Sequence, residues 1–410
     1  MKRRVAALIL VGAGALVFYT GRAFYIANKN PILNSYTQTI DKRKVSPQKL
    51  FDKNWHVIKE EYYDQSLNHQ HWSKWKNHYQ NKIKTQDDVK VATETMLASL
   101  NDPYSRYLTK EEFSNQKISI SSKIYGIGVS ITNDSGKIKI INIIEQTPAQ
   151  FADLRNGDII LSVNDKDISG LSISEVSNLV KGPENTIVSL DIMRGKSKIN
   201  KQIIRKEITI KTIKSSVEDN IGYVQISSFI SNSIPNEFLE ALENTSDSAG
   251  LILDLRGNTG GLLSNAVFLA NLFIENGKLV SIVGRNGYRY DVMAKDSNLS
   301  IDKPVVILVD QTSASATEIF AGAMKDWHKA KIVGTKTYGK GMVQKIIPMP
   351  NETGINLTIA KYLTPSGADI NKKGISPDVK VHFTKNDIET RTDTQLEMAK
   401  DILSKMISSR

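Results

Sequence analysis

A serine-rich turn in the C-terminal third of the chain has residue types that could carry out acyl transfer. An apolar run at 305–309 leads into the turn, and small and apolar residues follow at 319–324. This pattern predicts a buried strand, a tight turn and a buried helix, which would present a serine at a helix N-terminus. Unpaired N–H groups and the helix dipole favour developing negative charge there. The alternative is a helix cap by Ser313 or Ser315, with Glu318 completing a capping box.

A lysine between two glycines supplies a second chemical group. Lys340 lies between Gly339 and Gly341, just ahead of an apolar strand pattern that includes Gln344. Side chains four residues apart on a strand lie on one face, so Lys340 and Gln344 are expected to point the same way. An amide can orient an amine, and a neutral amine can take the proton of a serine hydroxyl. The two stretches together favour a serine nucleophile over a simple cap.

Ser315, Lys340 and Gln344 resemble the active-site pattern of the C-terminal processing peptidases, also called tail-specific proteases. That family has a serine within S-A-S-A-S-E, a lysine in G-K-G and a glutamine four residues later. All three residues match, and the 25-residue separation between Ser315 and Lys340 also fits, although Thr317 replaces a usual serine. The resemblance implies a serine-type endopeptidase with a Ser315–Lys340 dyad in which Gln344 takes part.

A lysine base places a physical condition on the site. The pKa of a free lysine amine is about 10.4, so a value near 7 requires a downward shift of about 3 units, or roughly 4 kcal/mol. Desolvation or nearby positive charge lowers a lysine pKa in this way, so the working site is expected to be closed or dry. A Ser-His-Asp triad with His328 is the alternative, and it would require Ser315 to reach across its own helix.

A glycine turn at 256–261 follows another buried strand pattern at 250–255. It resembles the family's D-L-R-x-N-P-G-G, with Thr259 in place of the proline. Beyond simple turn formation, it is expected to contribute to an oxyanion hole. The expected donors are the N–H groups of Gly261 and Ala316, with Gly260 as the alternative to Gly261.

Short strands at regular spacing over 117–209 indicate a PDZ domain. The glycines of the 125–129 stretch would let successive N–H groups turn inward and hold the terminal carboxylate of a peptide. The 148–160 region resembles the core pattern of such domains, and residues 172–180 would form the helix beside the groove. The expected peptide-binding residues are Gly126, Ile127, Gly128, Val129, Val176 and Val180.

The stretch 100–108, which reads LNDPYSRYL, resembles the signature ahead of the family's PDZ domain. Its expected role is packing and turn formation, without chemistry. Two helical patterns precede it, at 47–63 and 86–100, and three histidines lie between these two patterns (His69, His71 and His78). No carboxylate or cysteine supports these histidines at a metal-binding spacing, so a solvated surface is expected and no metal or cofactor is implied.

The N-terminus carries the pattern of an export signal. A basic start, Met1 to Arg4, precedes an uncharged stretch at 5–21 that Arg22 closes. No convincing cleavage site follows, so an uncleaved signal anchor is expected, with a cleaved signal peptide as the alternative. The corresponding location is the periplasm, at the inner membrane of a bacterium; the alternative is a soluble periplasmic or secreted protein.

The net charge of +11 does not favour nucleic-acid binding once its distribution is considered. Residues 1–44 hold eight basic side chains and one acid, a net +7, which leaves +4 for the remaining 366 residues. A basic leader next to a membrane accounts for that excess better than a nucleic-acid-binding face. The chain has no cysteine, which excludes disulfides, thiol catalysis and cysteine-ligated metals.

The sequence thus predicts a membrane-anchored multidomain protease of α/β plus α+β class, with N-terminal helices, an inserted PDZ domain and a mixed α/β catalytic core. The expected parts are a signal anchor or signal peptide (1–24), a linker (25–45), an N-terminal helical region (46–116), the PDZ domain (117–209), the catalytic core (210–384) and a C-terminal helical tail (385–410).

The predicted function is that of an exported serine endopeptidase, which recognises the C-terminal end of protein substrates through its PDZ domain. The predicted partners are polypeptides with accessible C-termini and the membrane, and the sequence leaves a homo-oligomer or an adaptor protein open. The alternative function is a non-catalytic PDZ scaffold. A nucleotide-binding reading of the glycine-rich stretch 334–341 is disfavoured, because Gly341 stands where a Mg²⁺-binding hydroxyl is required and a strand follows.

Overall fold

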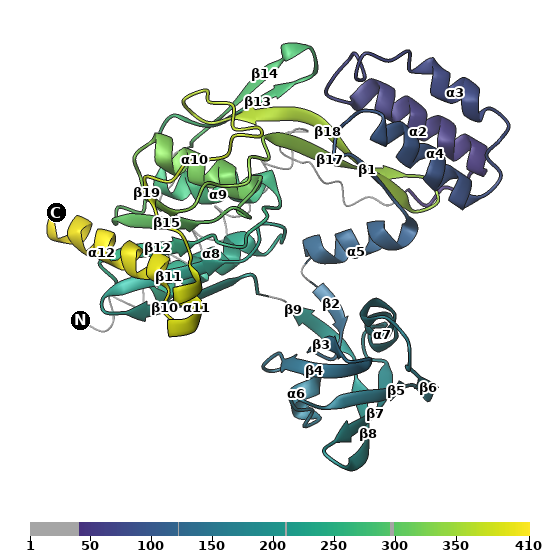
Figure 1. Ribbon diagram of the computed structural model, residues 1–410, viewed down its shortest axis with the longest axis horizontal. Helices are drawn as coiled ribbons and strands as arrows, with labels where there is room; N and C mark the ends of the chain where they lie inside the picture. Colours follow the sequence, from purple (N-terminus) through teal and green to yellow (C-terminus); the bar gives the residue numbers. More distant parts are fainter. Residues whose placement is uncertain (1–40, 122, 210, 296–298) are drawn as a thin grey trace, which may run out of the picture. The chain divides into compact units, whose positions relative to one another are not determined.

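The computed structural model describes residues 41–121, 123–209, 211–295 and 299–410; the predicted signal segment and most of the predicted linker lie outside them. The chain forms two compact units (Figure 1). One unit contains the residues up to Ile120 together with Thr212–Arg410, and the other contains Ser121–Lys211. Within the described ranges, no helix has the length and apolar character needed to cross a membrane.

A six-stranded sheet forms the centre of the larger unit. Its strand order is β10-β11-β12-β15-β16-β19, and every neighbouring pair is parallel except β10 with β11. The strands β12 and β15 are buried along their whole length, as expected for parallel strands covered on both faces. The strands comprise β10 (Ile213–Glu218), β11 (Ile221–Ile226), β12 (Gly250–Asp254), β15 (Val305–Val309), β16 (Lys331–Gly334) and β19 (Val379–Lys380).

Helices cover both faces of this sheet. Alternate strand residues such as Leu253 and Ile307 pack with α8 (Ile234–Asn244), α9 (Leu263–Phe273) and α10 (Ala316–Asp326). The residues between them, such as Ile252 and Val306, pack with α12 (Thr394–Ser408), which follows the short α11 (Lys385–Thr390). The predicted C-terminal tail is therefore an integral layer of the fold, and Figure 1 shows α12 lying across the strands.

A second, antiparallel sheet carries one wall of the cavity described below. Its strands run β1-β18-β13-β14, and β17 pairs with β18. The N-terminal helices pack on this sheet, with Leu50 and Phe51 in one core with Ile355 and Leu357. The strands are β1 (Arg106–Leu108), β13 (Lys278–Gly284), β14 (Arg289–Met293), β17 (Met342–Met349) and β18 (Thr353–Leu363), with the 3-10 turn η1 (Arg285–Gly287); the helices are α2 (Pro47–Glu61), α3 (Ser73–Tyr79) and α4 (Gln86–Ala98).

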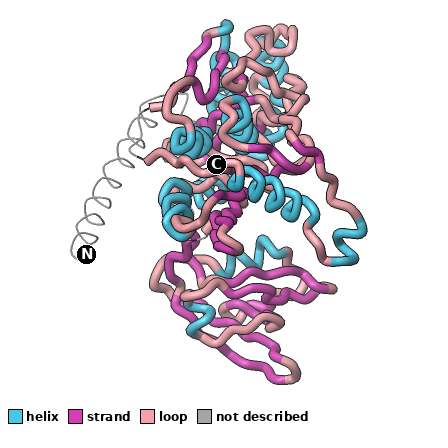
Figure 2. The backbone as a smooth tube through the Cα atoms, turned by 90° about the vertical axis from the view of Figure 1, so that its left-hand side faces the viewer, coloured by secondary structure: helices cyan, strands magenta, loops and turns pink. Residues whose placement is uncertain are grey.

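The smaller unit is mostly β-structure with two short helices (Figure 2). The helix α5 (Lys110–Ser121) continues past Lys117, so the smaller unit starts four residues later than the predicted domain boundary. Its sheet has the order β3-β4-β5-β7-β8, with β6 on β5, and β2 pairs with β9. The elements are β2 (Lys123–Gly126), β3 (Val129–Asp134), β4 (Lys137–Ile143), α6 (Pro148–Phe151), β5 (Ile159–Val163), β6 (Lys166–Asp167), α7 (Ile173–Val180), β7 (Ile187–Arg194), β8 (Ser197–Ile204) and β9 (Lys206–Thr209).

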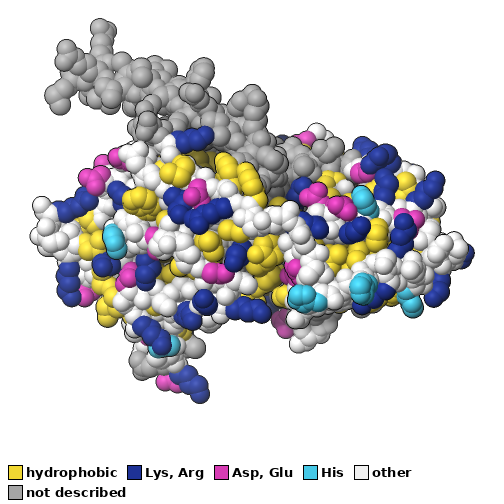
Figure 3. Space-filling view, turned by 90° about the horizontal axis from the view of Figure 1, so that it is seen from above, with side chains coloured by type: hydrophobic (Ala, Val, Ile, Leu, Met, Phe, Trp, Pro, Cys, Tyr) yellow, Lys and Arg dark blue, Asp and Glu magenta, His cyan; other side chains and the backbone are white. Residues whose placement is uncertain are grey.

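The surface carries mixed charge. On the coloured part of the face shown in Figure 3, basic side chains are interspersed with acidic and hydrophobic ones. A basic stripe along one element would be the footprint of a nucleic-acid-binding face, and the visible pattern differs from it. The predicted mixed α/β multidomain organisation is confirmed by the two units and their sheets.

Candidate active site

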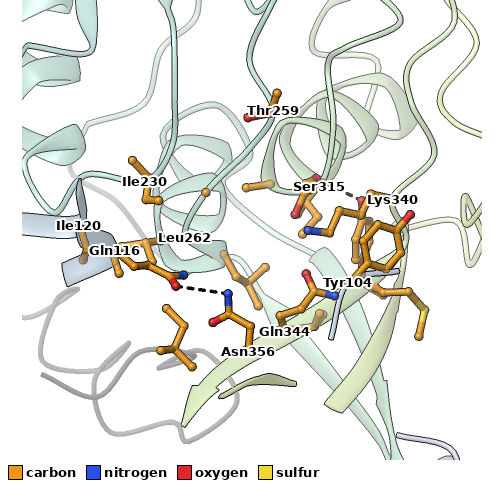
Figure 4. A pocket seen from close by; sticks show the side chains of 18 of the residues that line it. Tyr104, Gln116, Ile120, Ile230, Thr259, Leu262, Ser315, Lys340, Gln344 and Asn356 are labelled. Atoms are coloured by element: carbon orange, nitrogen blue, oxygen red, sulfur yellow. Dashed lines mark hydrogen bonds between the residues drawn. The ribbon is translucent and has the colours of Figure 1, made fainter. Parts of the chain in front are cut away.

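A cavity of about 350 Å³ lies in the larger unit, where the glycine turn, the serine turn and the second sheet meet (Figure 4). Ser315, Lys340 and Gln344 all line it, together with Gly261 and Ala316. The remaining lining residues come from the 100–108 segment, α5, α9, α10, the strands β17 and β18, and the loops that precede α8 and α9: Pro103, Tyr104, Arg106, Gln116, Ile120, Ile230, Thr259, Leu262, Leu263, Ile319, Met342, Val343, Ile346, Asn356 and Tyr362.

Ser315 occupies a strained turn between β15 and α10. Its φ of 58° and ψ of −119° lie outside the regions that a residue with a Cβ ordinarily adopts. The Tyr362 hydroxyl donates to the Ser315 carbonyl at 3.1 Å, and the Ser315 N–H donates to Glu318 at 2.9 Å, so both sides of the residue are held. Ser313 is fully buried and its hydroxyl donates to the Leu255 carbonyl at 2.9 Å, which makes Ser313 a structural residue of the turn.

Glu318 joins the serine turn to the lysine loop. Its carboxylate is fully buried and accepts the N–H groups of Ser315, Gly339 and Lys340 at 2.7–2.9 Å. It also accepts the Thr337 hydroxyl at 2.5 Å. The glycine-rich loop that resembles a phosphate-binding loop thus binds the chain's own carboxylate. The sequence pattern indicated only the local capping contact, because the lysine loop lies more than 20 residues away.

Lys340 lies in the loop just ahead of β17, where the sequence placed it, and therefore does not share a strand with Gln344. β17 begins at Met342, and a register shift lies between Val343 and Gln344. The strand-alternation argument was therefore wrong, although both side chains do line the same cavity. In Figure 4 the Lys340 side chain points toward Ser315. Among the described residues, the amine makes no hydrogen bond in this conformation.

The surroundings of the Lys340 amine favour its neutral form. Its Nζ lies 4.9 Å from the centre of the Tyr104 ring. Burial lowers the pKa of Lys340 below its ordinary value; Asp102 and Glu318 oppose the shift, and Arg106 adds to it. Tyr104 itself stays protonated at neutral pH, since burial and its neighbours raise its pKa to about 12.

The glycine turn packs directly on the serine turn. A Cβ on Gly260 would lie 2.8 Å from the Ser315 Cβ and 3.0 Å from the Ala316 nitrogen, which leaves room only for glycine. The Gly260 N–H is already bonded, because it donates to Asn258 Oδ1 at 2.9 Å. The N–H groups of Gly261 and Ala316 donate to no other residue in the described ranges. The buried Thr317 hydroxyl ties the two turns together through the Asn258 carbonyl at 3.0 Å.

His328 lies away from the cavity. It is exposed and follows the C-terminal end of α10, which begins at Ala316, immediately after Ser315. A helix of 11 residues spans roughly 16 Å, so the imidazole is at the far end of the helix from the serine. This placement agrees with the expectation that Ser315 would have to reach across its own helix to contact His328.

The six residues predicted to bind a peptide terminus lie together in the smaller unit, and three of them belong to its core. Ile127 and Val176 are buried and Val180 is 6% exposed, so they form part of the packed interior. Gly128 has a φ of 88°, and a Cβ there would collide with Thr147. Gly126 ends β2 and Val129 begins β3, so the glycines lie at a strand-to-strand connection.

Comparison with known proteins defines first a class and then a family. A model of the PDZ domain matches residues 139–194, and a model of peptidase family S41 matches residues 220–381, so the chain is a peptidase that carries a PDZ domain. It is 32% identical over 372 residues to the carboxyl-terminal-processing protease of Synechocystis sp. (strain PCC 6803), and the match covers 87% of each chain. The chain belongs to peptidase family S41, the serine peptidases that include the carboxyl-terminal processing proteases.

Two further relatives support this assignment. The carboxy-terminal processing protease CtpA of Bacillus subtilis is 37% identical over 307 residues, which cover 73% of this chain and 66% of that protein. The solved structure of a photosystem II D1 C-terminal processing protease is 31% identical with a TM-score of 0.54. That similarity covers 83% of this chain and 94% of the other. The predicted family is thereby confirmed.

Proposed function

We propose that this chain is an exported endopeptidase that cleaves polypeptides by acyl transfer, with Ser315 as nucleophile and Lys340 as general base. The observation that carries the proposal is the Lys340 amine, which is buried under the Tyr104 ring and points toward the strained serine turn. A buried lysine with a lowered pKa has the property that a general base at neutral pH requires.

In the proposed mechanism, the Ser315 hydroxyl attacks the scissile carbonyl and gives its proton to the neutral Lys340 amine. The tetrahedral oxyanion accepts hydrogen bonds from the Gly261 and Ala316 N–H groups, which are unpaired among the described residues. Lys340 then donates its proton to the departing amine, and water releases the acyl group in a second step. Gln344 orients the Lys340 amine throughout.

We assign the two oxyanion donors to backbone N–H groups, one in the glycine turn and one at the start of α10. The reason is geometric. The two turns are in contact, since Gly260 has no room for a Cβ beside Ala316. Gly260 is the weaker candidate because Asn258 already accepts its N–H. Gly261 and Ala316 line the cavity on the side of Ser315.

The proposed substrates are polypeptides with accessible C-termini. The smaller unit would hold the terminal carboxylate at the loop between β2 and β3, through backbone N–H groups of the 126–129 stretch. The basic and apolar N-terminal segment would export the chain and hold it at the membrane, and we propose no nucleic-acid partner. We propose the predicted domain boundaries with one change: the smaller unit starts at Ser121 instead of Lys117.

The test is cleavage of a fluorescein-labelled casein by the parent chain, Ser315→Ala, Lys340→Ala and His328→Ala. We expect the first two variants to lose cleavage by about 10⁴-fold or more, because each removes a group that the acyl transfer needs. His328→Ala should cleave like the parent. Cleavage by Lys340→Ala would contradict the dyad. Tail-peptide binding without cleavage by the parent would instead establish the scaffold alternative.

A further inference from the structure

The geometry points to a positioning role for Asp102, Ser105 and Thr358, which form a hydrogen-bonded relay that fixes the amide of Gln344 beside Lys340. The inference rests on the proposed Ser315–Lys340 chemistry and concerns residues outside the dyad. It also gives a role to the 100–108 segment, for which the sequence predicted packing and turn formation without chemistry.

The relay is a continuous chain of polar contacts. The Ser105 hydroxyl donates to Asp102 Oδ2 at 2.6 Å and lies 3.4 Å from the Thr358 hydroxyl. The Thr358 N–H donates to Ser105 Oγ at 3.0 Å. Gln344 Nε2 then donates to Thr358 Oγ1 at 3.3 Å. Thr358 is fully buried and Ser105 is 8% exposed, so water does not compete freely for these groups.

Counting protons gives the relay a direction. Ser105 has one hydroxyl proton, and the Asp102 carboxylate at 2.6 Å is its stronger acceptor. Ser105 Oγ in turn accepts the Thr358 N–H, and Thr358 Oγ1 accepts the Gln344 amide. With its NH₂ group held in this way, Gln344 keeps its carbonyl oxygen free for an amine. In Figure 4 the Gln344 side chain points toward the Lys340 amine.

A β-bulge in the second sheet determines which residue of β18 faces Gln344. Val343 pairs with Ala360, but Gln344 pairs with Thr358, so β18 contains one extra residue at this point. Such a bulge re-aims a side chain that regular pairing would place elsewhere. Here the bulge places Gln344 directly opposite Thr358, the residue that its amide contacts.

The same segment also surrounds the amine with charge and an aromatic ring. The charged or titratable groups that bear on Lys340 are Asp102, Arg106 and Tyr104 from this segment and Glu318 from α10. Asp102 Oδ1 accepts the Tyr104 N–H at 2.9 Å, so the carboxylate that ends the relay also holds the residue whose ring covers the amine. One short turn therefore supports both the orientation and the burial of Lys340.

The first experiment removes the Thr358 hydroxyl without changing charge or shape. We expect Thr358→Val to lower kcat on labelled casein by about 10- to 100-fold, with KM within about twofold of the parent. The matched control is Thr353→Val on the same strand; its buried hydroxyl donates to the Pro350 carbonyl and does not touch the relay. Equal activity of the two variants would overturn the inference.

A second readout separates positioning from general loss of packing. In a Gln344→Ala background the relay has nothing to orient, so adding Thr358→Val should cause no further loss of kcat. If the kcat losses of the two single variants multiply in the double variant, Thr358 acts in another way and the inference is overturned. Ser105→Ala breaks the relay at a different point and should repeat the result if Thr358→Val does not fold.

The pH dependence distinguishes the charged end of the relay from its neutral members. Asp102 raises the pKa of Lys340, so Asp102→Asn should move the acid limb of kcat/KM to lower pH, while Thr358→Val leaves the limb in place. An unshifted limb in Asp102→Asn would contradict the charge contribution. Labelling of the parent at Ser315 by a fluorophosphonate tests the proposed function separately. If the parent cleaves through Ser315 and the Thr358→Val variant cleaves as fast as the parent, the relay alone is refuted.

Discussion

At the scale of single residues, the proposed activity depends on keeping the Lys340 amine uncharged. Burial is the largest cause of the lowered pKa of Lys340, and the positive charge of Arg106 acts in the same direction. A lysine base works only when it is neutral, so kcat/KM should fall as the pH drops through the Lys340 pKa. This sign is fixed by the chemistry: protonation removes the lone pair that accepts the serine proton.

Replacement of Arg106 by glutamine tests this sign. Loss of the positive charge should raise the pKa of Lys340, so the acid limb of kcat/KM should move to higher pH. Lys110→Gln is the control, because that amine lies on α5 outside the cavity and pairs with Glu352. A limb that stays in place, or moves to lower pH, in Arg106→Gln would disprove the electrostatic account.

Glu318 is the second residue whose replacement gives a sharp expectation. Four donors converge on its buried carboxylate, and a glutamine would present an NH₂ group to some of them. We expect Glu318→Gln to lower kcat by about 100-fold and to destabilise the fold by about 2–4 kcal/mol. Urea denaturation and casein cleavage measure the two effects. Parent-like activity would show that the carboxylate does not hold the two loops in place.

The sequence motifs identified the candidate nucleophile and base, but not all of the residues that position them. The types and spacing of Ser315 and Lys340 could be read directly, since each lies in a short distinctive motif. The link from Asp102 to Thr358 spans more than 250 residues, and the bulge beside Gln344 has no glycine or proline to mark it. Such contacts depend on tertiary packing, which residue spacing does not encode.

At the scale of secondary-structure elements, the site depends on the close approach of two turns. Gly260→Ala would place a Cβ 2.6 Å from the Ala314 carbonyl oxygen and 2.8 Å from the Ser315 Cβ. We expect at least a 100-fold loss of kcat, because sub-ångström displacement of reacting groups is costly. Gly257→Ala is the matched control: it also has positive φ, but its Cβ would meet nothing within 4 Å.

The control variant should lose about 1 kcal/mol of stability from backbone strain and keep its activity. Casein cleavage at saturating substrate, together with thermal unfolding, separates the two effects. If both alanine variants lose activity equally, backbone strain rather than the contact between the turns is responsible.

The elements themselves were predicted well where the apolar pattern was strong. The strand 305–309 was predicted with its observed bounds, and the helices at 47–63 and 86–100 end within two residues of prediction. The strand-alternation argument that linked Lys340 to Gln344 failed because the strand begins only at Met342, after the glycine-flanked loop. Short polar loops next to strands carry no periodicity that could show where the strand starts.

The helix α12 tests the inference that the C-terminal segment is part of the fold. Leu403 is fully buried against the central sheet, whereas Met398 on the same helix is exposed. We expect Leu403→Ala to lower the free energy of unfolding by about 2–5 kcal/mol, and Met398→Ala to change it by less than about 0.5 kcal/mol. Denaturant titration measures the free energy of unfolding of each variant. Similar losses for the two variants would contradict the packing role of α12.

At the scale of the whole molecule, the chain combines a proposed reaction site in one unit with a proposed tail-binding site in the other. The glycine-flanked loop between β2 and β3 could be located from sequence. Sequence did not show that Val176 and Val180 are core residues, because valines four residues apart on a short helix suit a pocket wall and a core equally.

Recognition of a substrate tail predicts sensitivity to its terminal charge. A peptide with a free C-terminal carboxylate should have a KM about tenfold lower than the same peptide with an amidated end, because the amide removes the anion that the backbone N–H groups would bind. The kcat values should be similar. Equal KM values for the two peptides would show that the terminal carboxylate is not recognised.

The most direct test of the central claim is a titration of the Lys340 amine itself. The ¹³Cε resonance of Lys340 in the Ser315→Ala variant, assigned by comparison with Lys340→Arg, can be followed from pH 5 to 11. The account predicts a pKa below the ordinary lysine value of about 10.4. A Lys340 amine that titrates at or above that value would contradict its role as the general base.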